Sequence, residues 1–290
     1  MDEKLRDRVL ELIRRSSTDL PSDVEDALKA GRDIEEDGSG ARNILDNILQ
    51  NVKMARENST PICQDTGSLL FDVSMKRGED ERPIREAIEA AADAATKKYY
   101  LRPNAVDPVT GKNSGNNIGV NTPVIHFHFW DKDELFVRVL QKGGGSENVS
   151  GQFKLPDGTI GAGRDLNGVR KGVMKLVWEA QGKGCAPGII AVGIGGDRMT
   201  GFELAKMQLF RKIGQRSETP ELAELEERLK HDLNEFGVGP MGLGGKTTVL
   251  DVLVAQQHRH PATYYVSVAY MCWACRRRSM TIKNGEVTYD

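Results

Sequence analysis

The sequence predicts an α+β fold, with a helical N-terminal part followed by a mixed or antiparallel sheet region with packed helices. Apolar residues recur at helical spacing near the start of the chain, whereas alternation with period two appears after residue 120. Strand-like and helical segments do not alternate regularly, which argues against a doubly wound parallel sheet. No internal repeat or low-complexity linker interrupts the sequence. We therefore expect a single domain over residues 1–290.

Three amphipathic helices are expected in the N-terminal part. Apolar residues at Leu5–Ile13 follow the i, i+4, i+7 spacing of one helix face. A second helix should begin after Pro21 and end at Gly31, because these residues are typical of helix starts and stops. Leu45–Val52 carries the apolar face of a third helix.

The remaining elements follow from periodicity and turn residues. Leu69–Met75 is expected to be a strand, and the Ala-rich segment after it a helix with Pro83 in its first turn. PVIHFHFW and ELFVRVL both alternate and are joined by DKD, which predicts a β-hairpin. The glycine-rich stretch Lys142–Gly163 is expected to be a long loop. Further helices are expected at 165–181 and 220–237, and further strands in GIIAVGIGG, TTVLDVLVA, TYYVSVAY and MTIKNGEVTY, the last with an Asn-Gly turn.

Composition excludes several classes of protein. The 290 residues are 39% hydrophobic and 28% charged, as in soluble globular proteins. A net charge of -2 gives no reason to expect a nucleic acid or an anionic membrane as partner. No apolar run reaches the roughly 18 residues that a membrane span needs. The charged N-terminus lacks the apolar core of a signal peptide, so we expect the reducing cytoplasm.

The cysteines are the first candidates for chemistry. In a cytoplasmic chain they are better interpreted as metal or catalytic thiols than as disulfides, although a buried inert thiol is equally common for any one of them. The four are Cys63, Cys185, Cys272 and Cys275. Cys272-x-x-Cys275 is compatible with a redox pair, half of a zinc site or cluster ligands. His126 and His128 could complete a zinc site, but a half-exposed strand face explains them more simply.

Three glycine-rich segments resemble ligand-binding loops. The first, GPMGLGGKTT, has Pro240 where a phosphate-binding loop needs its first glycine. The second contains Gly193 and Gly195, but Arg198 stands where a dinucleotide fingerprint needs its third glycine. Both segments are predicted to be turns. Gly143–Asn148 begins with three successive glycines, whose amides could form an anion-binding concavity, with a flexible loop as the alternative.

The stretch TPICQDTG places Asp65 two residues after Cys63. Iron–sulfur clusters are held by thiolates, and a four-iron cluster with three protein thiolates leaves one iron open to act as a Lewis acid. Asp65, Arg102, His260 and the run Arg276–Arg278 supply the residue types that proton transfer and carboxylate binding require.

Five motifs in order carry a family resemblance. They are PICQDTG, KGGGSEN, GCAPGIIAVGIGG, RHP and CWACRR. The chain resembles the α subunit of class I fumarate hydratases, with L-tartrate dehydratase α subunits as close relatives, from Asn43 through Arg278. Each motif is short, but the ordered set is specific to iron–sulfur hydro-lyases.

The resemblance implies a [4Fe-4S] cluster held by Cys63, Cys185 and Cys272, with Cys275 outside the ligand set. It also implies a set of substrate contacts that includes the acid/base Asp65. The implied contacts are Gln64, Asp65, Arg102, Gly144, Gly145 and His260.

The resemblance further implies a partner. Single-chain class I fumarate hydratases carry a C-terminal domain with a catalytic threonine and further Arg and Lys contacts, which these 290 residues lack. A separate β subunit would complete the site of a hetero-oligomer. The expected reaction is reversible hydration of fumarate to L-malate. The alternatives are an L-tartrate dehydratase α subunit and, from another class, a non-catalytic zinc or CxxC redox protein.

Overall fold

The computed structural model describes residues 2–290, and its fold is α+β as predicted. The chain divides into two compact units, which are described separately. The first comprises Met1–Pro21, Gln50–Gly144 and Arg276–Asp290, and the second comprises Ser22–Leu49 and Gly145–Cys275. None of the helices in residues 2–290 is both long enough and apolar enough to cross a membrane.

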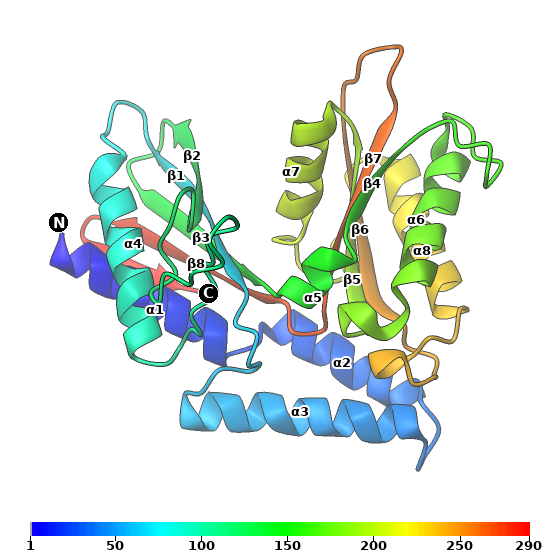
Figure 1. The fold of residues 1–290 in the computed structure, drawn as a ribbon, viewed down its shortest axis with the longest axis horizontal. Coiled ribbons are helices and arrows are strands. Elements are labelled where there is room, and N and C mark those ends of the chain that lie inside the picture. Colours follow the sequence, from blue (N-terminus) through cyan, green and yellow to red (C-terminus); the bar gives the residue numbers. More distant parts are fainter. Residues whose placement is uncertain (1) are drawn as a thin grey trace. The chain divides into compact units, whose positions relative to one another are not determined.

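The first unit is a five-stranded mixed sheet covered by two helices (Figure 1). The strand order is β2-β1-β3-β8-β9, and β1 and β2 are parallel while the other pairs are antiparallel. Helices α1 and α4 pack their apolar faces on the sheet and bury one core cluster. The bounds are α1 (Glu3–Thr18), β1 (Ser68–Lys76), α4 (Arg82–Lys97), β2 (Val124–Trp130), β3 (Leu135–Lys142), β8 (Arg276–Lys283) and β9 (Glu286–Tyr289).

The predicted hairpin of β2 and β3 is wrong. Both strands pair with β1, so that Val73 faces Phe127 on one side and Val137 on the other. The alternation of apolar and polar residues indicates which face of a strand is buried, but it does not indicate which strand is its neighbour in the sheet. Strand β1 is buried along most of its length, which suits it to the central position between two partners.

The helix predicted to end at Gly31 continues to Ile34. Helix α2 spans Ser22–Ile34, and α3 spans Gly40–Asn58. A Cβ at Gly31 would lie 2.8 Å from Cγ2 of Thr247, so glycine permits close packing here rather than ending the helix.

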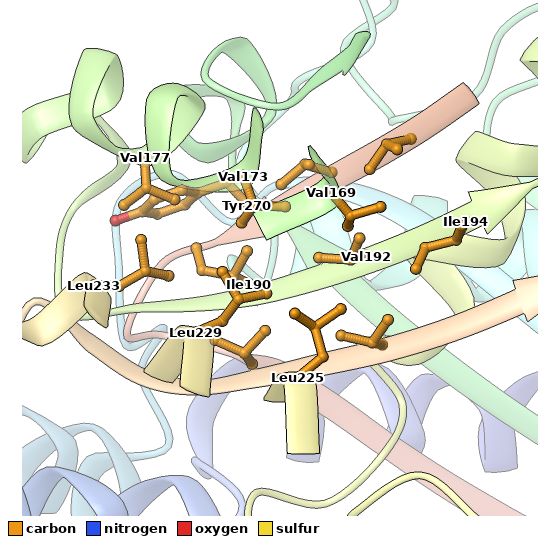
Figure 2. Packing of buried hydrophobic residues seen from close by; sticks show 14 of the residues in the cluster. Val169, Val173, Val177, Ile190, Val192, Ile194, Leu225, Leu229, Leu233 and Tyr270 are labelled. Atoms are coloured by element: carbon orange, nitrogen blue, oxygen red, sulfur yellow. The ribbon is translucent and has the colours of Figure 1, made fainter. Parts of the chain in front are cut away.

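The second unit is built on a four-stranded sheet of order β4-β7-β5-β6. Helices α6 and α8 cover one face, and side chains from both converge on alternate residues of β5 (Figure 2). Helix α7 packs against β5 and β7, on the other side of the sheet from α6 and α8 (Figure 1). The bounds are β4 (Gly151–Lys154), α6 (Leu166–Ala180), β5 (Gly188–Gly195), α7 (Arg198–Gln208), α8 (Pro220–Asn234), β6 (Val249–Gln257) and β7 (Tyr265–Met271).

The sequence prediction missed several elements of this unit. The stretch expected to be one long loop contains the short helix α5 (Gly144–Asn148) and strand β4. Successive glycines have low helix propensity, which hides α5. Helix α7 was also missed, although Asp197 and Thr200 form a capping box at its start. Two 3-10 turns, η1 (Gln181–Gly184) and η2 (Pro240–Gly242), complete the assignment.

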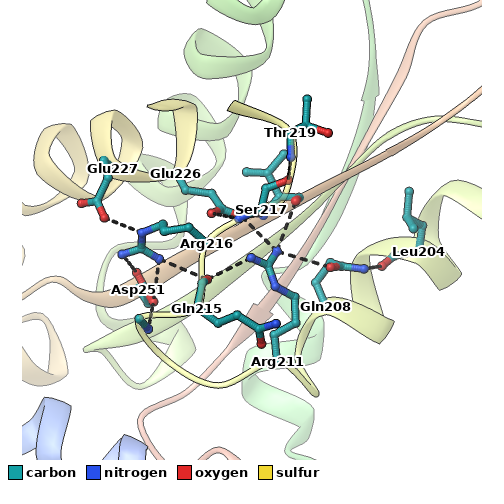
Figure 3. Close-up of polar contacts among 12 residues, drawn as sticks. Leu204, Gln208, Arg211, Gln215, Arg216, Ser217, Thr219, Glu226, Glu227 and Asp251 are labelled. Atoms are coloured by element: carbon teal, nitrogen blue, oxygen red, sulfur yellow. Dashed lines mark hydrogen bonds and ion pairs between the residues drawn. The ribbon is translucent and has the colours of Figure 1, made fainter. Parts of the chain in front are cut away.

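Buried ion pairs connect α8 with the sheet of the second unit (Figure 3). Glu226 is fully buried, and its carboxylate accepts hydrogen bonds from Arg211 at 2.9 Å and from the Val254 amide at 2.6 Å. Asp251 is also fully buried, and the Arg216 guanidinium donates to both of its oxygens. These carboxylates are paired, as burial requires.

Candidate active site

The loop that carries Cys63, Gln64 and Asp65 is held at both ends. Before it, the Ile62 amide donates to the Ser17 carbonyl at 3.0 Å, and Asn51 donates to the Ile62 carbonyl at 2.8 Å. After it, Gly67 has a φ of +78°, and a Cβ there would lie 2.6 Å from the carbonyl carbon of Lys142. Glycine at this position therefore lets the loop turn directly into β1.

Asp65 is fixed through both its side chain and its backbone. Its Oδ1 accepts a hydrogen bond from the Gly67 amide at 3.0 Å, and its Oδ2 accepts one from the Gly144 amide at 2.8 Å. The guanidinium of Arg276, which is 1% exposed, donates to the Asp65 carbonyl at 2.7 Å. Each carboxylate oxygen retains a second lone pair, so the oriented carboxylate can still accept a proton.

Cys63, Gln64 and Arg102 line one cavity of about 440 Å³ in the first unit. The backbone of Arg102 is held on both sides, because its amide donates to Thr66 Oγ1 at 3.0 Å and its carbonyl accepts from Asn117 at 3.0 Å. Its side chain is exposed, and its guanidinium forms no ion pair with a carboxylate of residues 2–290. Arg102 therefore presents to this cavity a cation that is available to an anionic ligand.

Asn117 and its partners were not recognised from the sequence. Asn117 is 5% exposed, donates to Thr96 Oγ1 at 2.8 Å, and accepts a hydrogen bond from the Asn104 amide at 2.8 Å. Asn104 in turn donates its side-chain amide to Thr66 at 3.2 Å. The sequence feature that could have identified this group is the Asn- and Gly-rich stretch around Asn117. Asn117 has a φ of +62°, which Asn tolerates well.

One of the three successive glycines binds a carboxylate of the chain itself. Gly144 donates its amide to Asp65, and a Cβ at Gly143 would lie 3.0 Å from the same carboxylate oxygen. Gly145 belongs to the second unit, where it lines a cavity of about 550 Å³ together with Ser150 and Lys183. The turn that was predicted to bind an anion therefore binds the Asp65 carboxylate of the same chain.

The structure brings Cys185 and Cys272 to the same end of the second sheet. Cys185 follows η1 with φ 57° and ψ 63°, and its carbonyl accepts a hydrogen bond from the Trp273 amide at 3.4 Å. Cys272 directly follows β7, which ends at Met271. Tyr270 packs beside this pair, and burial raises the pKa of its phenol, with a further contribution from the two cysteines.

The exposure of the thiols separates Cys275 from the other three. Cys275 is completely buried, whereas Cys63, Cys185 and Cys272 are partly exposed. Cys63 belongs to the first unit and the other two to the second. Within residues 2–290, no group of three or more His, Cys, Asp and Glu side chains is placed as a metal site. Accessible thiols are the donors that an iron–sulfur cluster requires, so the residue types fit the expected group.

His260 lies in a separate cavity of about 820 Å³ in the second unit, which His258 and Arg198 also line. The Ala262 amide donates to Nδ1 of His260 at 3.1 Å, so the proton of the neutral ring is on Nε2. Arg259 shapes this loop by donating to the carbonyls of residues 260, 261 and 263. His260 is therefore a positioned donor at an open surface.

Two groups of basic residues considered in the sequence have structural partners. His128 lies 2.7 Å from Asp72, whose other carboxylate oxygen accepts two hydrogen bonds from Arg138. This arrangement agrees with the half-exposed strand face that was preferred over a zinc site. In the arginine run, Arg278 donates to the Asp19 carbonyl at 2.9 Å, so this side chain stabilises the fold of the first unit.

The segment GPMGLGGKTT is a turn, as predicted. The amides of Lys246 and Thr247 donate to the buried carboxylate of Glu35 at 2.9 and 2.8 Å, and Lys246 Nζ donates to the Ile34 carbonyl. A phosphate loop would direct such amides and its lysine toward a ligand. Here they connect the turn to α2.

Comparison with known proteins identifies the class. Residues 6–281 match the family model described as fumarate hydratase (Fumerase). A protein of Geobacillus stearothermophilus, provisionally named a class I fumarate hydratase, is 46% identical over 290 residues. A provisionally named L(+)-tartrate dehydratase subunit alpha of Methanocaldococcus jannaschii is 36% identical, and the L(+)-tartrate dehydratase subunit alpha of Escherichia coli K12 is 32% identical. The chain thus belongs to the fumarate hydratase family.

The relatives differ in how much of them the chain covers. The alignment includes 98% of this chain but 56% of the Geobacillus protein. It includes 97% of this chain and 98% of the Methanocaldococcus subunit, and 99% of this chain and 93% of the Escherichia subunit. The chain therefore spans little more than half of the first relative and nearly all of the two named alpha subunits.

Proposed function

We propose that the chain is the α subunit of a hydro-lyase that catalyses reversible hydration of fumarate to L-malate. The observation that carries this proposal is the cavity of about 440 Å³ where Arg102 lies beside Cys63 and Gln64. A dicarboxylate needs a fixed cation, and the backbone of Arg102 is held at both its amide and its carbonyl. Family membership supports the reaction class.

Cys63, Cys185 and Cys272 would hold a [4Fe-4S] cluster, and Cys275 would stay outside it. The partial exposure of the first three thiols and the complete burial of Cys275 support this division. When bound, such a cluster supplies Lewis-acid chemistry at the one iron without a protein thiolate. We keep the cytoplasm as the proposed compartment, because its reducing conditions suit thiolate ligands.

Asp65 is the proposed acid/base at the substrate hydroxyl. Its carboxylate is oriented by the Gly67 and Gly144 amides, and each oxygen can still accept a proton. It would donate a proton to departing hydroxide in one direction and accept one from attacking water in the other. Arg102 and Gln64 would bind a carboxylate, with Gly144, Gly145 and His260 as further contacts. The amide of Gly144 would act by orienting Asp65.

A separate β subunit would supply the base at the adjacent carbon, which makes the enzyme a hetero-oligomer. Two of the relatives are named alpha subunits, and the chain covers 98% and 93% of them. Their names support a partner of this kind for the present chain.

L-tartrate is the second candidate substrate. It is favoured by the names of the two alpha-subunit relatives, whereas the relative at 46% identity favours fumarate. Both substrates are four-carbon dicarboxylates, so Arg102 serves either of them. The additional hydroxyl of tartrate requires its own hydrogen-bond partners, and the β subunit is the proposed source of some of them.

The test is anaerobic coexpression with the candidate β subunit, followed by assays on L-malate and L-tartrate side by side. A brown complex with about four irons that dehydrates malate faster supports the proposal. Faster turnover of tartrate assigns the chain to the second substrate. Stoichiometric zinc, with no turnover of either acid, would support the zinc or redox alternative and overturn the hydro-lyase proposal.

A further inference from the structure

Tyr270 is the buried aromatic residue at the cysteine end of the second unit. It lies on β7 opposite Ile190 of β5 and is fully buried. Figure 2 shows its ring beside Val173 and Val177 at the edge of the core. The residue therefore belongs to the core through its ring, while its hydroxyl needs a separate explanation.

Two glycines of the GCAPG segment, Gly184 and Gly188, accommodate this ring. A Cβ at Gly184 would lie 2.4 Å from a ring carbon of Tyr270, and a Cβ at Gly188 would lie 2.7 Å from the hydroxyl oxygen. Any larger residue at either position would therefore clash with the tyrosine. The phenol is thus held against the backbone of the GCAPG segment that carries Cys185.

The hydroxyl of Tyr270 is buried and has no hydrogen-bond partner among residues 2–290. Burying an unsatisfied hydroxyl destabilises the folded state, whereas phenylalanine would fill the same space without this penalty. The presence of a tyrosine here is explained if its buried hydroxyl donates a hydrogen bond in another state of the protein.

The position of the hydroxyl indicates that partner. Cys185 directly follows Gly184, and Cys272 is two residues beyond Tyr270 on the chain. The hydrogen bond from the Trp273 amide to the Cys185 carbonyl holds the two cysteine segments together.

We propose that the Tyr270 hydroxyl donates a hydrogen bond to a sulfur of the group that Cys185 and Cys272 hold. This inference rests on the proposed function, because the group is the cluster proposed there. Tyr270 is a positioning residue and does not touch substrate. Hydrogen bonds to cluster sulfurs stabilise the more negative, reduced form, so the hydroxyl should raise the reduction potential of the cluster.

The test compares Tyr270→Phe with Tyr264→Phe in the complete complex with the β subunit, purified anaerobically. Tyr264 is a matched control, because it is 9% exposed and belongs to the same core cluster. Iron content, the reduction potential by titration monitored with electron paramagnetic resonance, and Fe–S stretching frequencies by resonance Raman are measured for each. We expect Tyr270→Phe to keep its iron, with a lower potential and shifted frequencies, and Tyr264→Phe to match the wild type.

Thermal melting without iron gives the second measurement. Iron-free Tyr270→Phe should melt at the same temperature as the wild type or higher, because the substitution removes an unsatisfied hydroxyl. A loss of melting temperature in the iron-free protein would instead show that the hydroxyl has a partner within the chain, and would overturn the inference. An unchanged potential in iron-loaded Tyr270→Phe would overturn it while leaving the proposed function standing. A wild-type complex without iron would overturn both.

Discussion

The carboxylate of Asp65 accepts a hydrogen bond from the Gly144 amide at 2.8 Å, across 79 residues of the chain. This contact joins Asp65 of the CQDTG motif to Gly144, the last glycine of the first unit before the chain enters the second. It gives the glycine turn a concrete role, which is to orient the proposed acid/base.

Asp65→Asn should lower kcat by about 10²–10⁴ while the cluster is retained, because loss of a general acid/base has this magnitude. Steady-state kinetics of the αβ complex and its visible absorbance are the measurements. Asp133→Asn is the control, since Asp133 is an exposed carboxylate paired with Lys76 at 2.8 Å. Turnover of Asp65→Asn at the wild-type rate would remove Asp65 from the mechanism.

Arg102→Met should lower kcat/KM by about 10- to 150-fold, because a hydrogen bond to a charged group contributes roughly 1.5–3 kcal/mol. The loss should appear with every dicarboxylate that the complex accepts. Arg82→Met is the matched control, because Arg82 is an exposed arginine of the same unit that pairs with Asp80. Equal kinetics in the two variants would show that Arg102 does not bind substrate.

Cys272→Ser should abolish the visible absorbance of the cluster, whereas Cys275→Ser should retain it. Cys272 is partly exposed, and Cys275 is completely buried. The second variant should still lose about 1–3 kcal/mol of unfolding free energy, because it introduces a buried hydroxyl. The reverse pattern of absorbance would overturn the choice of ligands.

Gly67→Ala should destabilise the protein far more than Gly78→Ala. Both glycines have positive φ, +78° and +89°, so each alanine incurs about 1–2 kcal/mol of backbone strain. At Gly67 the new Cβ would also lie 2.6 Å from the Lys142 backbone, whereas nothing lies within 4 Å at Gly78. Chemical denaturation of both variants measures the difference. Equal losses would mean that the loop moves away from β3 at no cost.

Glu226→Ala should lower the free energy of unfolding by about 3–5 kcal/mol, because it leaves Arg211 without its buried partner. Glu224→Ala on the same helix is the control, since Glu224 is exposed and the change should stay within about 0.5 kcal/mol. Denaturant midpoints compare the two. Similar midpoints would show that the network in Figure 3 contributes little to stability.

The predicted helices and strands correspond to observed elements where local pattern is sufficient. Apolar spacing identified α1, α3, α4, α6 and α8, and the Asn284-Gly285 turn between β8 and β9 follows from residue type. The exact end of α2 and the existence of α7 did not follow, because Gly31 serves packing and the apolar periodicity of α7 is weak. The roles of the candidate site residues stay predictions.

The sequence by itself determined most of the helical and extended segments, with α5, α7 and β4 as exceptions, and it determined which short motifs carry thiols, acids and cations. These properties depend on near neighbours in the chain, through periodicity, capping and turn chemistry. Tertiary structure decided that β1 separates β2 from β3, that Gly144 donates to Asp65, and that the Tyr270 hydroxyl is buried beside the cysteine segments. Each of these features depends on which distant segments pack together, and the spacing of residues along the chain does not specify those partners.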